Sequence, residues 1–286
     1  MITSPQNAKI RELVKLKKSA KERAKKGLFL VEGPKMFWEI PEQLCREVYV
    51  SESFARIEDG KRAMEKAGRL GIIAQTAADP VFRYLSDTQT PQGILAVVSQ
   101  LTYGLKDLTG TGIGEQAVLS SGAGAGVPGQ GMPLVMILEN LQDPGNLGTI
   151  LRTAEAAGAT GILLSSGCAD LYSPKVTRST MGSIFRVPFV YTDHLGQAIR
   201  FLQERGLRVY AAHLKGSRDL YEEGDALKEP VAFLVGNESR GLTAQTAALA
   251  DAAIRIPMSG KVESLNAAIA AGVMMFEAKR LRRILK

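Results

Sequence analysis

The sequence predicts an α/β protein of two domains, and three observations support this prediction. With 286 residues, the chain is long for a single domain. Short apolar runs alternate with helical stretches on both sides of a middle segment. That segment holds eight glycines between Gly110 and Gly131 and has no apolar periodicity. We therefore expect a first domain over 1–103, a linker over 104–131 and a second domain over 132–286.

The first domain is expected to begin with a helix over 5–26, where apolar residues recur near helical spacing among strong helix formers. Strand-like and helical runs then alternate, as in a small α/β sandwich. The expected strands are 29–33, 47–51, 71–76 and 93–101, and the expected helices are 34–40, 52–67 and 77–86.

The glycine-rich middle segment has two interpretations. Its composition buries too little apolar surface to offset the entropy of ordering, which favours a flexible linker. A cradle for phosphate groups is the alternative, but no helix that begins with Lys-Ser or Lys-Thr follows the glycines. We therefore expect a linker.

In the second domain the alternation resumes after Pro133. The strands are apolar almost throughout, which indicates a parallel sheet covered on both faces. The first strand is not followed by G-x-G-x-x-G, which argues against an ordinary dinucleotide-binding domain. The expected strands are 133–141, 159–166, 185–191, 208–214, 230–238 and 252–258, and the expected helices are 146–158, 174–182, 195–205, one after Leu242, and 264–284.

The composition excludes a disulfide framework and disfavours a metal site. Cys45 and Cys168 lie in different expected domains, and His194 and His213 are the only histidines. No apolar run is long enough to span a membrane, and the N-terminus lacks the apolar centre of a signal peptide. We therefore expect a cytoplasmic protein without a bound metal ion or a membrane contact.

The net charge of +7 is located in the first 35 residues. These hold ten basic and three acidic side chains, so ten minus three gives +7 and the remaining 251 residues sum to zero. Clustered cations bind polyanions through the release of counterions. A solvated helix face is the alternative, and an anionic membrane surface is a weaker one. The candidate ligands of a polyanion are Lys9, Arg11, Lys15, Lys17, Lys18, Arg23, Lys25 and Lys26.

A first polar cluster, at 140–153, follows the strand that opens the second domain. It reads Asn-Leu-Gln-Asp-Pro-Gly-Asn-Leu-Gly-Thr-Ile-Leu-Arg-Thr. The junction between a strand end and a helix is where α/β sheets contact their ligands. Asn146 can cap the helix and Arg152 lies about two turns further on, so a cap with a solvated arginine is the alternative interpretation.

A second cluster, Gly-Asn-Glu-Ser-Arg-Gly-Leu, follows an apolar strand at 236–242. Gly236 would let a ligand approach the backbone closely, because glycine has no side chain. Glu238 places a carboxylate at the end of the strand, where it can hold a hydroxyl group or a cation. An ordinary turn between a strand and a helix is the alternative interpretation.

A third cluster, Ile-Pro-Met-Ser-Gly-Lys-Val-Glu-Ser-Leu-Asn, occupies 256–266. Pro257 ends a strand and Gly260 permits a tight loop. Ser264 can cap the long final helix, with Asn266 in its first turn. Capping explains Ser264 better than it explains the polar Asn266 before a small, apolar run.

Taken in order, the three clusters resemble the signature motifs of the SpoU/TrmH family, within the SPOUT superfamily of RNA methyltransferases. The matching patterns are N-x-G-x-x-x-R, G-N-E-x-x-G and I-P-M-x-G-x-x-E-S-L-N. They cover essentially the whole of 133–286. The first domain resembles, less closely, the ribosomal-protein-like substrate-binding domain that often precedes this catalytic domain, chiefly in its length, its alternation and the run Phe-Leu-Val-Glu-Gly-Pro-Lys-Met-Phe-Trp-Glu-Ile.

The resemblance implies an α/β-knot domain, with a SPOUT trefoil knot that holds S-adenosylmethionine, and transfer of a methyl group to a ribose 2′-hydroxyl of RNA. It also implies a homodimer through the C-terminal domain, in which Arg152 reaches toward the partner's cofactor. The implied cofactor-binding residues are Leu214, Gly236, Ile256, Met258 and Leu265, and the implied catalytic residues are Asn146, Arg152, Glu238, Ser264 and Asn266.

The role of Arg152 stays open between a base, as the family proposes, and an electrostatic clamp on phosphate and the developing alkoxide. We favour the clamp, because a guanidinium resists deprotonation. In the stretch at 173–183, which also resembles the family, Lys175 and Arg178 either contact RNA phosphate or belong to an amphipathic covering helix. Trp38 is expected to pack rather than to stack on a base.

Two rival functions remain. A non-catalytic RNA-binding assembly factor would have the same fold, and an NAD-dependent enzyme would need the missing glycine fingerprint. For the RNA, the basic segment and the ribosomal-protein-like domain favour ribosomal RNA over transfer RNA.

Overall fold

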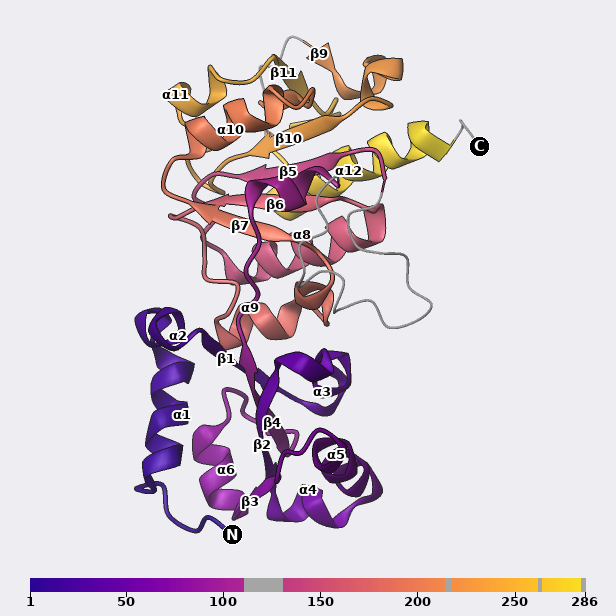
Figure 1. Cartoon of the computed structure of the whole chain (residues 1–286). Helices are drawn as coiled ribbons and strands as arrows, with labels where there is room; N and C mark the ends of the chain where they lie inside the picture. Colours follow the sequence, from indigo (N-terminus) through magenta and orange to yellow (C-terminus); the bar gives the residue numbers. More distant parts are fainter. Residues whose placement is uncertain (111–130, 214–217, 262–263, 284–286) are drawn as a thin grey trace. The chain divides into compact units, whose positions relative to one another are not determined.

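The computed structural model divides the chain into two compact units (Figure 1). No helix within the described part of the chain is long and apolar enough to cross a membrane. The described residues are 1–110, 131–213, 218–261 and 264–283. The first unit comprises Met1–Leu101 and Asp170–Phe185, and the second comprises Thr102–Ala169 and Arg186–Lys286.

The first unit is built on a four-stranded mixed sheet in the order β1-β4-β2-β3. Strand β4 pairs antiparallel with β1 and β2, and β2 pairs parallel with β3. Its elements are α1 (Ala8–Lys18), α2 (Ala20–Lys26), β1 (Leu28–Glu32), α3 (Pro34–Glu39), η1 (Glu42–Leu44), β2 (Cys45–Ser51), α4 (Glu52–Arg56), α5 (Glu58–Arg69), β3 (Gln75–Ala77), α6 (Asp79–Leu85), β4 (Ile94–Ser99), α9 (Pro174–Ser179) and η3 (Ser183–Phe185).

The single helix expected over 5–26 is two helices, α1 and α2, which meet at Ser19. Ser19 has an extended backbone, and its side chain accepts a hydrogen bond from the Glu22 amide as the N-cap of α2. The hydrophobic periodicity alone did not reveal this break. A serine within a periodic run is compatible both with a helix cap and with a solvent-facing position inside one continuous helix.

Helix α1 is an integral part of the core of the first unit. Ile10, Leu13 and Leu16 are almost fully buried in a cluster with residues of α6 such as Phe82 and Leu85. Helices α1 and α6 therefore cover one face of the sheet, and α3 and α5 lie on the other (Figure 1). The basic segment is a folded helix pair and not a detached arm.

Residues 170–185 belong to the first unit, although the sequence predicted them as part of the second domain. The Tyr172 hydroxyl donates to the Leu101 carbonyl over 2.8 Å, and the Leu101 amide donates back over 2.9 Å. The Phe29 and Tyr172 rings lie 4.7 Å apart, centroid to centroid. These contacts are distant in sequence, so local patterns carry no signal for them.

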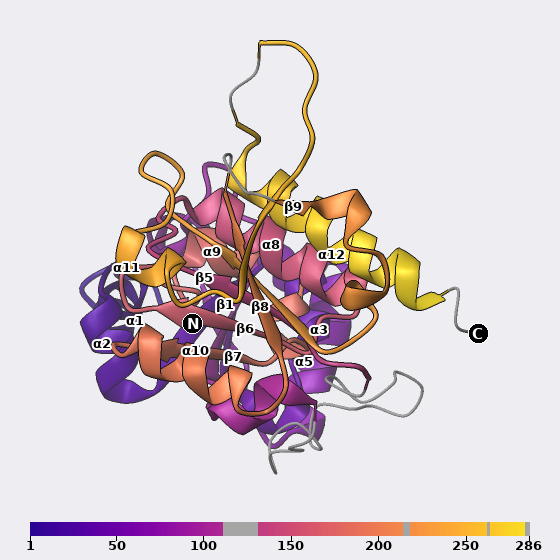
Figure 2. The ribbon, with the colours of Figure 1, turned by 90° about the horizontal axis from the view of Figure 1, so that it is seen from above.

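The second unit holds a seven-stranded sheet in the order β7-β6-β5-β10-β8-β11-β9, and every pair in it is parallel (Figure 2). This confirms the predicted covered parallel sheet. The elements are η2 (Leu105–Thr109), β5 (Leu134–Leu138), α8 (Pro144–Ala157), β6 (Gly161–Ser165), β7 (Phe189–Thr192), α10 (Leu195–Gln203), β8 (Arg208–Ala212), β9 (Arg218–Asp219), η4 (Leu220–Glu222), η5 (Gly224–Leu227), β10 (Val231–Val235), α11 (Ala244–Ala247), β11 (Ala252–Arg255) and α12 (Ala267–Arg283).

The beginning of the expected linker is structured, so the prediction was wrong for these residues. Helix η2 places Leu108, which is fully buried, in the core of the second unit. The Thr160 hydroxyl donates to the Leu108 carbonyl over 2.6 Å. The rest of the expected linker, 111–130, lies outside the described residues.

Candidate active site

The first two polar clusters meet at one edge of the second sheet, because β5 and β10 are parallel neighbours in register. The Glu238 carboxylate accepts hydrogen bonds from the amides of Asp143 (2.9 Å) and Gln142 (3.3 Å) and from the side chain of Asn146 (3.2 Å). The Glu238 carboxylate, which follows β10, thus stabilises the loop that follows the neighbouring strand β5.

The third cluster joins them through its asparagine. The Asn266 side-chain amide donates to Oδ1 of Asn146 over 2.9 Å, and Asn146 donates to Glu238. The structure therefore brings three of the five expected catalytic residues into one chain of hydrogen bonds, Asn266 to Asn146 to Glu238. This chain fixes the orientation of the Asn146 amide.

Two helix caps differ from the sequence-based expectation. Asp143, and not Asn146, caps α8, because its carboxylate accepts from the Asn146 amide over 2.7 Å and Pro144 begins the helix. Asn266, and not Ser264, accepts from the Ala268 amide over 2.9 Å at the start of α12. Asn146 is therefore free of the capping role that was the alternative explanation for it.

Two asparagines that the sequence analysis did not single out hold the same junction. Asn140 has a positive φ of 54°, which asparagine tolerates better than most residues. The Asn237 side chain donates to the Asn140 carbonyl over 2.8 Å. A polar residue directly after an apolar strand was the only signal available for either.

Hydrogen bonds keep Glu238 charged. Burial alone would raise the pKa of Glu238, but the Asp143 amide, its own amide, the Asn146 side chain and the Gln142 amide together hold that pKa below its usual value of 4.5. A proton on this carboxylate would remove an acceptor from at least one of these donors.

A cavity of about 520 Å³ opens beside this network. Its size is within the range of small-ligand sites, and its walls combine apolar side chains with the backbone of three loops. Four of the five expected cofactor-binding residues line it, together with Glu238 and Ser264; the fifth, Leu214, lies outside the described residues. The lining residues are Ala212, His213, Val235, Gly236, Asn237, Glu238, Ser239, Arg240, Gly241, Leu242, Ile254, Arg255, Ile256, Met258, Ser264, Leu265, Ala267, Ala270 and Met274.

The loop after β10 has no room for a side chain at Gly236. A Cβ atom there would lie 2.2 Å from the Gly241 carbonyl carbon and 2.3 Å from the Leu242 nitrogen. The Asn237 and Gly241 backbones pair across this turn, with hydrogen bonds of 3.1 and 2.8 Å. A side chain at position 236 would therefore distort the loop itself.

A buried carboxylate, also missed by the sequence analysis, holds the far end of this loop. Glu139 is 6% exposed and accepts from the Thr243 amide and hydroxyl, each over 2.8 Å, and from the Thr246 hydroxyl over 2.5 Å. The loop is thus held by Glu238 at one end and by Glu139 at the other.

Arg152 does not line the cavity. It lies on α8 and is exposed, and its side chain makes no hydrogen bond or ion pair with any residue in the described part of the chain. Its guanidinium is therefore available to an anion from outside the unit.

The structure separates the expected RNA ligands into paired and unpaired cations. The prediction that Arg23 is a surface ligand of RNA is wrong, because Arg23 is 4% exposed and its guanidinium bonds to the Asp170 carboxylate over 2.6 Å. Lys17 donates to the carbonyls of Tyr84 and Ser86. The further paired cations are Lys9 with Glu47, Lys26 with Glu12 and Arg178 with Asp87.

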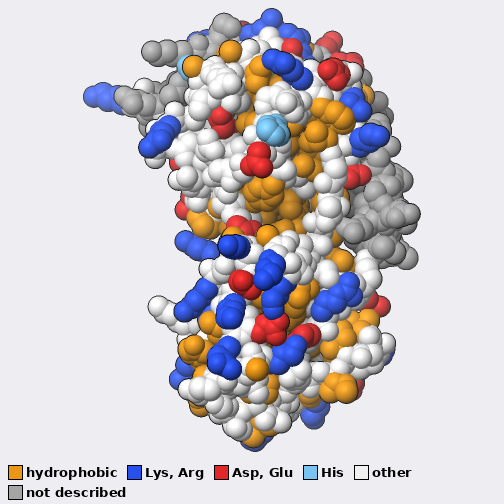
Figure 3. All heavy atoms as spheres, turned by 60° about the vertical axis from the view of Figure 1, so that its left-hand side comes forward, with side chains coloured by type: hydrophobic (Ala, Val, Ile, Leu, Met, Phe, Trp, Pro, Cys, Tyr) orange, Lys and Arg blue, Asp and Glu red, His pale blue; other side chains and the backbone are white. Residues whose placement is uncertain are grey.

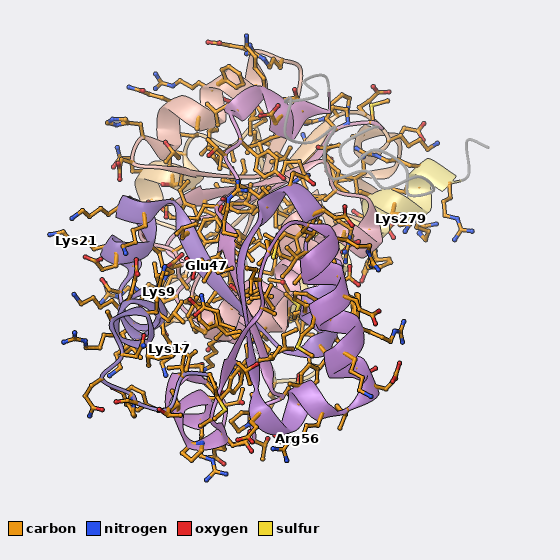
Figure 4. The ribbon with its side chains drawn as sticks, turned by 60° about the horizontal axis from the view of Figure 1, so that its bottom comes forward. Lys9, Lys17, Lys21, Glu47, Arg56 and Lys279 are labelled. Atoms are coloured by element: carbon orange, nitrogen blue, oxygen red, sulfur yellow. The ribbon has the colours of Figure 1, made fainter. Side chains whose placement is uncertain are left out.

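The remaining expected ligands are exposed, and their side chains make no hydrogen bond or ion pair with a described residue; they are Arg11, Lys15, Lys18, Lys25 and Lys175. In Figure 4, Lys9 lies beside Glu47, whereas Lys21 extends outward from α2. Figure 3 shows Lys and Arg side chains gathered over the surface of the first unit, with acidic side chains among them.

Known proteins share both parts of this chain. Residues 133–276 match the SpoU rRNA Methylase family, and residues 7–96 match the MRM3-like substrate binding domain. Over 281 residues, which are 97% of this chain and 98% of the relative, the chain is 30% identical to the 23S rRNA (guanosine(2553)-2'-O)-methyltransferase RlmP of Bacillus subtilis (strain 168). Mouse (Mus musculus) mitochondrial rRNA methyltransferase 3 is 29% identical over 332 aligned residues, with 98% of this chain and 74% of the relative covered.

Solved structures show the same similarity. An AdoMet-bound rRNA methyltransferase from Sinorhizobium meliloti is 30% identical, with a TM-score of 0.79 over 98% of this chain and 97% of that chain. The AdoMet complex of AviRb, a SpoU methyltransferase of Streptomyces viridochromogenes, has a TM-score of 0.81 at 25% identity over 97% of this chain and 99% of that chain. The family match over residues 133–276, which contain the second sheet and the three clusters, and the 30% identity to a relative over nearly its whole length lead to one conclusion: this chain belongs to the SpoU rRNA methylase family.

Proposed function

We propose that this protein transfers a methyl group from S-adenosylmethionine to a ribose 2′-hydroxyl of ribosomal RNA. The observation that carries the proposal is the hydrogen-bond chain from Asn266 through Asn146 to Glu238 at the edge of a ligand-sized cavity. Relatives named as 23S rRNA 2'-O-methyltransferases support the reaction and the class of RNA.

The cofactor fits the cavity lined by Gly236, Ile256, Met258 and Leu265. The loops that follow β10 and β11 present backbone groups there, and Met258 and Leu265 add apolar surface. When bound, S-adenosylmethionine supplies a methyl group that is activated by its attachment to a sulfonium centre.

Catalysis in this scheme rests largely on positioning, because methyl transfer needs the ribose oxygen in line with the carbon–sulfur bond. Asn146, Ser264 and Asn266 orient the ribose. Arg152 stabilises the RNA phosphate and the negative charge that develops on the 2′-oxygen as its proton leaves to phosphate or water. Glu238 accepts a hydrogen bond from the Asn146 side chain and acts in this scheme through Asn146, so we assign it a positioning role.

The same proposal includes a trefoil knot in the second unit. The strand order supports it, because β10 lies between β5 and β8 while β11 lies beyond β8. The loops after β10 and β11, which line the cavity, would form the crossing segments of the knot.

A homodimer through α12 is part of the proposal. Ile269 and Phe276 are 55% and 46% exposed, and with half-buried Val273 they form an apolar stripe at helical spacing. A second copy that covers this stripe would bring its own cofactor cavity toward Arg152.

We expect light scattering at micromolar concentration to give twice the mass of one chain. A variant with Ile269→Glu and Phe276→Glu should give a single-chain mass and lose most methyl transfer, because the shared site is lost. A matched change outside the stripe, Tyr221→Glu, removes a 54% exposed side chain and should leave the dimer intact. A fully active monomer would contradict the shared site.

Glu238→Gln should lower methyl transfer by roughly tenfold or more, because the new amide group faces donors and can accept fewer hydrogen bonds.

The lowered pKa of Glu238 also predicts that the stability lost in Glu238→Gln depends on pH. The carboxylate contributes stability above its usual pKa of 4.5, and this contribution is lost as the pH falls through the lowered value. Thermal unfolding of both proteins should therefore differ most near neutral pH and converge in acid; an equal difference at every pH would contradict this.

The experiment that tests the function is methylation in vitro with labelled cofactor, on ribosomal RNA and on bulk transfer RNA, followed by nuclease mapping. We expect label on a ribose 2′-oxygen of ribosomal RNA. Label found only in transfer RNA would contradict ribosomal RNA as the substrate, and label on a base would contradict transfer to a ribose 2′-oxygen. RNA binding without methyl transfer would indicate an assembly factor.

A further inference from the structure

We propose that Trp38 is a stacking platform for an unpaired base of RNA, flanked by the exposed cations Lys35 and Arg62. The inference rests on the proposed function, because it takes RNA as the ligand of the first unit. Trp38 is the only tryptophan of the chain and packs on Phe37 as expected, but it is also 41% exposed on α3.

The structure holds the indole in place without burying it. Phe37, the preceding residue, is 1% exposed and anchors α3, and its ring lies 5.6 Å from the Trp38 ring in an edge-to-face arrangement. Lys66 donates to the Phe37 carbonyl over 3.3 Å, and its Nζ lies 5.3 Å from the indole centroid. A ring that is already ordered loses little conformational entropy when a ligand stacks on it.

Two cationic side chains of α5 lie near the ring, the exposed Arg62 and the buried Lys66. Arg62 and Lys66 are four residues apart on this helix, so they occupy one of its faces, and the Arg62 Cζ lies 5.7 Å from the indole centroid. Lys35 is three residues before Trp38 on α3, is exposed, and makes no hydrogen bond or ion pair with a described residue. The exposed part of the indole is thus accompanied by positive charge.

An unpaired stretch of RNA is the ligand that this combination fits best. A base offers a flat face to the indole, and the phosphates beside it pair with the exposed side chains of Lys35 and Arg62. A duplex fits poorly, because its bases are stacked on one another and not available. The platform is also separate from the basic face of α1, since α3 and α5 cover the opposite face of the sheet (Figure 1).

The test uses the tryptophan itself. Because Trp38 is the only tryptophan, fluorescence excited near 295 nm reports on this position alone in the full-length protein. We expect a short single-stranded oligoribonucleotide to quench it saturably, a blunt duplex of equal length to quench it much less, and polyphosphate, which lacks bases, to leave it unchanged. Binding of each ligand is followed independently by anisotropy of a label on the RNA, or by calorimetry for polyphosphate.

Variants separate stacking from charge. Trp38→Ala should weaken single-stranded RNA binding about tenfold without changing its salt dependence, because stacking releases no counterions. Trp38→Phe should restore most of the affinity, and circular dichroism checks that both variants fold. Lys15→Gln, on α1, should instead lower the salt dependence and leave the quenching amplitude unchanged.

The outcomes distinguish this inference from the proposed function. RNA that binds by anisotropy but leaves the fluorescence unchanged, with Trp38→Ala binding as tightly as the wild type, would overturn the platform and leave methyl transfer untouched. If Trp38→Ala fails to fold, unquenched fluorescence in the RNA-bound wild type still overturns it. Failure to bind any RNA would overturn the proposed function as well.

Discussion

Replacing Arg152 with alanine should reduce methyl transfer by about a hundredfold or more and leave cofactor affinity nearly unchanged. Arg152 is exposed and does not line the cavity, and its side chain makes no hydrogen bond or ion pair within the described residues, so its truncation breaks no such interaction there. A group that stabilises charge only as the 2′-oxygen loses its proton contributes to kcat and not to cofactor binding. Calorimetry measures the cofactor affinity, and single-turnover transfer to RNA measures the rate.

Two further variants test the geometry of this role. Arg152→Lys should recover little activity, because an ammonium group cannot make the two parallel contacts that a guanidinium makes with phosphate. Arg200→Ala removes another exposed cation of the second unit, on α10, and should be neutral. Substantial activity in Arg152→Lys would refute bidentate contact with phosphate. A large loss of activity in Arg200→Ala would show that the loss in Arg152→Ala reflects the net charge of the protein and not the position of Arg152.

The triple variant Arg11→Gln, Lys15→Gln and Lys18→Gln should lower RNA affinity strongly and reduce its salt dependence. The three residues are spaced at i, i+4 and i+7 on α1 and are exposed, and their side chains make no hydrogen bond or ion pair with a described residue. Each lost phosphate contact lowers the slope of log affinity against log salt by about 0.7 to 0.9, so three lower it by roughly two to three units. Titrations of labelled RNA at several salt concentrations measure this slope.

Deleting residues 1–26 would not serve as this test, because Ile10, Leu13 and Leu16 belong to the core of the first unit. A better control is Lys9→Gln on the same helix, since Lys9 already bonds to Glu47 over 2.9 Å. The hydrogen bond to Glu47 and the nearby Glu12 carboxylate raise the pKa of Lys9. Lys9 therefore stays charged, but its ammonium group is already paired with Glu47. A slope change for Lys9→Gln as large as that of each unpaired cation would contradict the distinction.

Much of the fold could be predicted from the sequence because its signals are local. The buried strands β4, β5 and β10 follow from short apolar runs, and the helix expected over 146–158 ends at Gly158, which adopts the left-handed conformation typical of a glycine after a helix. The sequence also contained the three polar clusters that the sheet brings together, since parallel neighbours place their following loops at one edge.

Other features depended on contacts that no local pattern encodes. The pairing of Arg23 with Asp170 joins residues 147 positions apart, and it turned an expected RNA ligand into a buried structural residue. The placement of 170–185 in the first unit has the same cause.

The sequence by itself determined the residues of the site, and only the tertiary structure decided what each one does. The motifs name Asn146, Glu238 and Asn266, but a sequence cannot tell a cap from a link in a hydrogen-bond chain. Asp143 takes the cap of α8 and leaves the Asn146 side chain to bridge the other two. Each of these groups has several potential partners along the chain, and the folded sheet brings only some of them within hydrogen-bond distance.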